Sequence, residues 1–144
     1  MSGPQEEVSV PGAGAGVESR ARGTSDPELD RAALGAVGES ALQRLLVVST
    51  RRSAQSATVA RFMVALHDGR RFPFDLGELR GVHAEVFGDC LEVLKMDAST
   101  RLEIDDLVSG GGRTLERLAE RWNLLDMDKL KTAARDAGVR LTGL

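Results

Sequence analysis

Few residues of this chain have the chemistry of an active site, and their spacing limits what they can do together. His83 and Cys90 are the first candidates, because a thiolate beside an imidazole can act as a nucleophile or bind a metal ion. They are seven residues apart, which places them about 10 Å apart along the axis of one helix. That distance excludes a direct Cys-His pair, and Glu85 and Asp89 point elsewhere on the helical wheel. We therefore predict no catalytic, cofactor-binding or metal-binding residue, with Cys90 buried and His83 partly exposed. An enzyme built around His83 and nearby acids stays open as a hypothesis that requires a closed pocket.

Three consecutive glycines at residues 110–112, followed by Arg113 and Thr114, form the second candidate site. A helix that begins here could direct backbone N–H groups toward an anion. The segment lacks both the Gly-Lys-Ser/Thr ending of a phosphate-binding loop and the spacing of a dinucleotide fingerprint. We expect a linker rather than a nucleotide site.

Residues 51–80 are rich in arginine and suggest a basic surface. This stretch holds six arginines against three acids, Asp68, Asp75 and Glu78. If the helix predicted at 53–68 lay against DNA, phosphates could be contacted by Arg51, Arg52, Arg61, Arg70 and Arg71. That helix carries few polar residues able to contact bases beyond Gln55, Ser56 and Thr58, and the chain after its N-terminal segment is not basic overall. DNA binding is therefore the alternative hypothesis.

Residues 81–128 have the opposite charge, with eleven acids against five bases. The acids that could form a face for a basic partner are Glu92, Asp97, Glu103, Asp105 and Asp106. They lack the alternating frame of a calcium-binding loop, so a protein partner is the better expectation. A body polarised in this way can steer a partner or favour association with a second copy.

The composition fits one domain in a reducing compartment. The chain has 144 residues, of which 42% are hydrophobic and 3% aromatic, so leucine, valine and alanine must build the core. So few aromatic residues argue against a base-stacking platform for single-stranded nucleic acid. Cys90 is the only cysteine, and no signal-peptide pattern or membrane-length apolar run is present. We expect a cytoplasmic protein without membrane contact.

The hydrophobic pattern predicts an all-α fold: a compact bundle of about five to six short helices after a disordered tail at residues 1–24. The single helical domain spans residues 25–144. Apolar spacing predicts helices near 27–37, 39–50, 53–68, 82–96, 113–123 and 126–138, and a single helical turn at 76–80. The expected N-caps are Ser25 or Asp26, Ser53, Asp75 and Asp126. Gly38 is expected to interrupt the first two, and the helix at 82–96 is expected to be central. Residues 101–108 fit either a strand or a helical turn.

Several motifs make residues 41–123 resemble a known family. They are ALQRLL, AQSATVARFMVAL, RFPFDLGELRG, DCLEVLKMD and LERLAERW. The chain resembles an uncharacterised domain-of-unknown-function family of small proteobacterial proteins, often encoded on plasmids or integrated elements. The family has no established activity or catalytic residues, so the resemblance assigns no site. This chain adds the N-terminal tail and the helix after Asn123.

Taken together, the sequence favours a non-enzymatic protein-interaction module, an accessory or anti-defence factor of a bacterial mobile element. Its partner is expected to be a protein, and a homo-oligomer is compatible with the charge pattern. The alternative is a DNA-binding transcriptional regulator that uses the basic face of residues 51–80.

Overall fold

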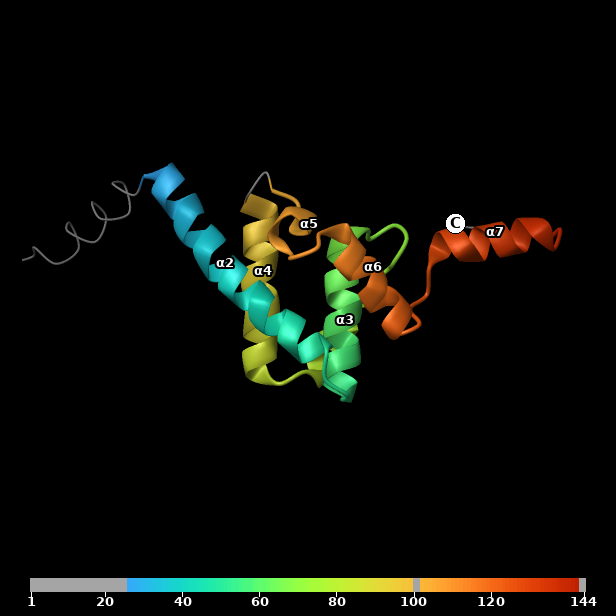
Figure 1. The fold of residues 1–144 in the computed structure, drawn as a ribbon, viewed down its shortest axis with the longest axis horizontal. Helices are drawn as coiled ribbons and strands as arrows, with labels where there is room; N and C mark the ends of the chain where they lie inside the picture. The colour runs from blue at the N-terminus through green and yellow to red at the C-terminus, as the bar shows by residue number, and fades with distance from the viewer. Residues whose placement is uncertain (1–25, 100–101, 143–144) are drawn as a thin grey trace, which may run out of the picture.

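All regular elements in the part of the chain that the structure describes are helices, which confirms the all-α prediction (Figure 1). The computed structural model describes residues 26–99 and 102–142. The elements are α2 (Pro27–Ser49), α3 (Ala54–His67), the 3₁₀ helix η1 (Leu76–Gly81), α4 (Ala84–Ser99), α5 (Ile104–Leu107), α6 (Gly112–Arg121) and α7 (Met127–Asp136). The tail predicted at residues 1–24 lies outside the described residues.

The starts of four elements are fixed by side-chain caps, three of which the sequence predicted, while Asp26 was one of two candidates for the first. The caps are Asp26, Ser53, Asp75 and Asp126. In α3, for example, Ser53 Oγ accepts a hydrogen bond of 3.1 Å from the backbone N–H of Ser56. Each cap satisfies an N–H group that the first helical turn leaves without a partner.

Gly38 does not interrupt the first helix, so the predicted break was wrong. α2 runs without a break for 23 residues and passes through Gly38, which is buried. A Cβ atom at this position would lie 2.8 Å from Met96 Sδ, 2.9 Å from Met96 Cγ and closer still to Met96 Cβ. The glycine therefore allows α2 and α4 to cross at close range instead of ending a helix.

α3 is the central helix, rather than the segment predicted at 82–96. That segment is α4, which packs mainly against α2, whereas α3 contacts α2, α5, α6 and η1. The reason is that α3 is apolar over most of its circumference, with Val59, Ala60, Phe62, Met63 and Val64 all buried. The loop after α3 is fixed to this helix by Phe74, whose ring meets that of Phe62 edge to face at 5.7 Å.

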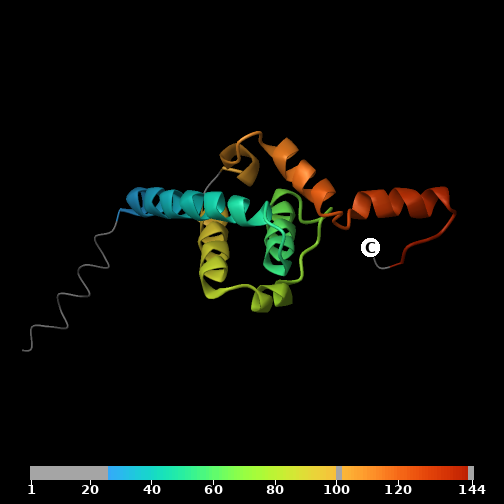
Figure 2. The same cartoon turned by 60° about the horizontal axis from the view of Figure 1, so that its bottom comes forward.

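The short helices α5 and α7 differ in how they pack against the rest of the chain. Within residues 101–108, the described part forms one helical turn, α5, which answers the choice between strand and helix. α7 extends away from the other helices in both views (Figures 1 and 2) and has no buried residue. It is shorter than predicted, because Asp126 is its N-cap and the chain leaves the helix before Gly138, where φ is 70°. None of the described helices has the length and apolar character required to cross a bilayer.

Candidate functional site

Five ionisable side chains meet where the end of α3, the short helix α5, the middle of α6 and the start of α7 come together. His67 is the last residue of α3, Asp105 lies in α5, Glu116 lies in α6 and Asp126 caps α7. Arg71 comes from the segment between α3 and η1. We call these five residues the charged cluster.

His67 bridges two carboxylates across the cluster. Its Nδ1 lies 2.7 Å from Asp105 Oδ1, and its Nε2 lies 3.0 Å from Glu116 Oε1. Partial burial lowers the pKa of His67, but the hydrogen bonds and charges of Glu116 and Asp105 outweigh it, so the pKa lies above its ordinary value. With both nitrogens protonated, the ring donates one hydrogen bond to each carboxylate.

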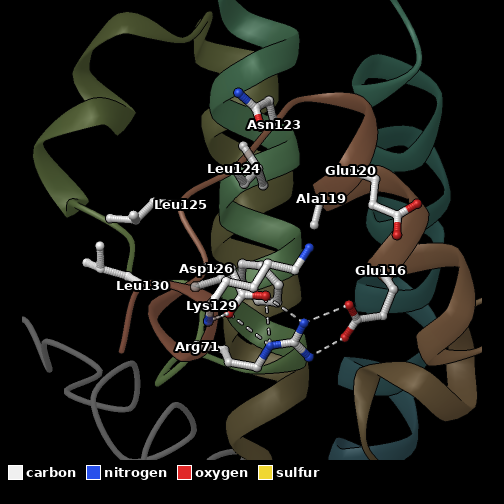
Figure 3. Close-up of a pocket in the computed structure, with 11 residues that line it drawn as sticks. Arg71, Glu116, Ala119, Glu120, Asn123, Leu124, Leu125, Asp126, Lys129 and Leu130 are labelled. Atoms are coloured by element: carbon white, nitrogen blue, oxygen red, sulfur yellow. Dashed lines mark hydrogen bonds and ion pairs between the residues drawn. The ribbon is translucent and has the colours of Figure 1, made fainter. Parts of the chain in front are cut away.

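Arg71 joins the cluster to the first turn of α7 (Figure 3). Its Nη1 donates to Glu116 Oε1 at 2.6 Å, and its Nη2 donates to Glu116 Oε2 at 2.9 Å and to Asp126 Oδ2 at 2.8 Å. These hydrogen bonds lower the pKa of both carboxyl groups and raise that of Arg71. The backbone adds a further tie, because the N–H of Met127 donates to the carbonyl of Arg71 at 2.8 Å. Arg71 and Asp126 therefore form a clamp at the base of α7.

A hollow of about 450 Å³ lies beside this clamp, between α6 and the start of α7 (Figure 3). Its charged lining consists of Arg71, Glu116, Glu120, Asp126 and Lys129. Arg71 already donates to two carboxylates, so most of its N–H groups and its charge are paired within the chain. Among the described residues, no group of three His, Cys, Asp or Glu side chains is placed to hold a metal ion. The charged cluster is therefore a joint that connects α3, α5, α6 and the start of α7.

The triple glycine makes room for this joint. Gly110 and Gly111 have φ values of 85° and 61°, which side-chain-bearing residues rarely adopt. A Cβ atom on Gly112 would lie 2.8 Å from Asp105 Oδ2 and 3.0 Å from His67 Cε1. The three glycines raised the question of an anion at the start of α6. The negatively charged group near this point is the carboxylate of Asp105, which belongs to the chain itself.

The structure does not bring His83 and Cys90 together into a site. His83 is exposed just before α4, and Cys90 is fully buried within that helix. Burial and the charge of Asp89 raise the pKa of the Cys90 thiol to about 12. A thiol in this environment is a poor nucleophile at neutral pH.

The five arginines of the predicted basic face lie in different surroundings. Arg51 and Arg52 are exposed in the turn before α3, whereas Arg70 and Arg71 follow its far end, about 21 Å away by the helical rise over 14 residues. Arg61 pairs with Glu78 at 2.7 Å, and Arg71 belongs to the clamp. Two pairs of these arginines, 51–52 and 70–71, therefore lie at opposite ends of one helix.

The five predicted acidic residues also have separate roles. Asp105 pairs with His67, and Glu92 pairs with Lys95 at 3.0 Å. Glu103 and Asp106 cap α5 reciprocally, with the N–H of Glu103 donating to Asp106 Oδ2 at 3.1 Å. Asp97 is partly buried, which raises its pKa. Asp105 is thus the member of this set that belongs to the charged cluster.

Local spacing in the sequence gave no sign of the charged cluster. The paired residues are 38 to 55 positions apart in the chain, so no helical or strand period relates them. The available signals were Asp126 as a cap and the three glycines, and neither identifies His67 or Glu116 as a partner.

These features define a small all-helical protein whose last helix is held by a charge clamp. Residues 39–123 match a family described as "Family of unknown function (DUF7673)", and this match covers more than half of the chain. The chain therefore belongs to this family, which confirms the resemblance to an uncharacterised domain family. No curated protein and no solved structure matches the chain.

Proposed function

We propose that this chain is a non-enzymatic protein-interaction module that presents α7 to a partner protein. The observation that carries the proposal is the exposure of α7, whose ten residues include none that is buried. Isolated helices shorter than about 12 residues are marginal in water, so a helix of this length gains most of its stability from packing. A partner that covers α7 would supply that packing.

The apolar residues on and beside α7 support this proposal. Leu125 is 58% exposed and Leu130 is 39% exposed, and both line the hollow next to the clamp. A partner side chain placed there would bury both leucines. The charged cluster supports the non-enzymatic part of the proposal, because its acids and bases pair with one another.

The biological setting is also proposed. The family resemblance supports a bacterial protein that serves a mobile element as an accessory or anti-defence factor. A free, buried Cys90 supports the reducing environment of the cytoplasm. A second copy of the chain is one of the partners that the proposal allows.

Site-specific photo-crosslinking in cells tests the proposed role of α7. A photo-crosslinking amino acid at Leu130 should yield covalent adducts with a protein, and mass spectrometry would show whether that protein is a second copy. The matched control carries the same amino acid at Leu76, which is 69% exposed but lies in η1. No protein adduct from position 130, or equal adducts from both positions, would contradict the proposal.

The alternative, a DNA-binding regulator that uses residues 51–80, has less support. Two of the polar residues expected to contact bases, Ser56 and Thr58, are buried in the bundle. Arg61 and Arg71 are paired with carboxylates. Duplex binding measured across a salt series tests this alternative, which requires tight binding that weakens as salt rises.

A further inference from the structure

A second surface, distinct from α7, has the features of a docking groove. It lies between the end of α2, the segment after α5 and one side of α6, and its volume is about 420 Å³. Its apolar floor is formed by Leu46, Val47, Val108 and Leu118, and its charged lining consists of Arg117 and Arg121. Val47 is 54% exposed, so part of this floor is open to solvent.

The two arginines of the groove have no carboxylate partner among the described residues. Three other arginines, Arg44, Arg61 and Arg71, each pair with an acid. Arg121 instead donates from Nη2 to the carbonyl of Thr50 at 2.6 Å, which fixes its guanidinium beside the end of α2 without neutralising its charge. The groove therefore combines an apolar floor with uncompensated positive charge.

The positive charge continues beyond the groove. Arg121 also lines a neighbouring hollow together with Arg52 and Trp122. The indole Nε1 of Trp122 donates to the carbonyl of Ser49 at 3.0 Å, which holds α6 against the end of α2. Because this hydrogen bond joins the two helices that line the groove, the groove is a fixed feature of the bundle.

We propose that this groove binds an acidic amphipathic segment of a partner protein. Apolar side chains of the segment would cover Val47 and Leu118, and two carboxylates would pair with Arg117 and Arg121. The arginines are one helical turn apart, about 6 Å along α6, which matches two acids at i and i+4 of a partner helix. Bidentate pairs of arginine with carboxylate are among the stronger hydrogen-bonded contacts. Duplex DNA would offer charge to the arginines but no aliphatic side chain to the floor. The inference goes beyond the proposed function, because it places a second binding surface away from α7.

Selection from a random 12-residue peptide library on the immobilised full chain tests the inference. Enriched peptides should carry at least two acids together with large apolar residues. Synthetic copies should bind at least tenfold more weakly to the Arg117→Gln/Arg121→Gln variant, because two charged hydrogen-bonded contacts are lost. Arg117→Gln alone, which breaks no hydrogen bond among the described residues, should weaken binding in the same direction. The control Arg113→Gln/Arg135→Gln removes the same charge outside the groove and should change binding less than twofold.

Three results would overturn the inference: no enrichment, enriched peptides without acids, or equal binding to the wild type and the Arg117→Gln/Arg121→Gln variant. Displacement of the peptides by a 20-base-pair DNA duplex that binds more tightly would also overturn it, in favour of nucleic acid. Failure of the groove is distinguishable from failure of the proposed function, because crosslinking from Leu130 uses neither arginine. Protein adducts at Leu130 without peptide binding would leave the interaction module in place and remove only the groove.

Discussion

Replacing Arg71 with glutamine removes the guanidinium that joins α6 to the base of α7. The clamp predicts that this change destabilises the fold and releases α7. Arg70→Gln is the matched control, because Arg70 is the adjacent residue, is exposed and loses the same charge.

The size of the effect follows from what each partner of Arg71 loses. The side chain of Asp126 is only 6% exposed, so water cannot readily replace the lost hydrogen bonds. It keeps the backbone N–H groups of Asp128 and Lys129 at 3.0 and 3.3 Å, and Glu116, with a side chain 36% exposed, can be rehydrated. Breaking a fully buried ion pair costs about 3 to 5 kcal/mol, and this partial compensation reduces the expected loss of unfolding free energy to about 2 kcal/mol.

Urea unfolding measures this loss directly. Trp122 is the only tryptophan and contacts the end of α2, so its fluorescence reports the packing of α6. With a slope of about 2 kcal/mol per molar urea, the midpoint for Arg71→Gln should fall by about 1 M, while that for Arg70→Gln should stay close to the wild type. Trypsin should also cut faster after Lys129 in Arg71→Gln. Equal midpoints for the two variants would refute the reasoning, because the clamp would then add no net stability.

Three further predictions follow from buried contacts and titrating groups. Because the pKa of His67 is raised in the folded state, its contribution to stability is fully present below about pH 6.5 and is lost as pH rises through the folded pKa. The urea midpoint should therefore fall over this range in the wild type and fall less in His67→Gln. Parallel pH profiles of the two proteins would contradict this. Gly38→Ala should lower the unfolding free energy by about 1 to 2 kcal/mol, since overpacking against Met96 exceeds the gain in helix propensity. Gly35→Ala, where the new Cβ would have no atom within 4 Å beyond its own stretch of helix, should be neutral or stabilising. The same sign for both variants would count against the close crossing. Cys90 should react with a thiol reagent only when the protein unfolds, because burial raises its pKa to about 12; fast labelling of the folded protein would disprove this.

The features predicted correctly from the sequence are those that depend on neighbouring residues. Ser53 and Asp126 were recognisable as caps because a cap binds N–H groups two or three positions ahead. The predicted helix break at Gly38 was wrong because the structural role of this glycine depends on Met96, 58 positions away in another helix.

The charged residues show the same limit more strongly. Arg71 and Asp105 were noted as members of a basic and an acidic surface, since sequence shows only the sign of a charge and its neighbours. In the fold, Arg71 faces Glu116 and Asp126, and Asp105 faces His67, so these two residues act within one joint. Charge runs along the chain therefore overestimated the free charge at these positions, whereas Arg117 and Arg121, which no run singled out, keep theirs.

The clamp also bears on how a short exposed helix could bind a partner well. Forming the first turn is the unfavourable step of helix formation, because several residues are fixed for a single hydrogen bond. In α7 that turn is already held, since Asp126 accepts from two of its N–H groups and Met127 donates to the carbonyl of Arg71. A partner that covers Leu130 would need only to stabilise the later turns, so less of its binding free energy would be lost to ordering the helix. Arg71→Gln should then weaken binding at α7 without removing any residue that contacts the partner, whereas a change at Leu130 should weaken it by removing the contact itself.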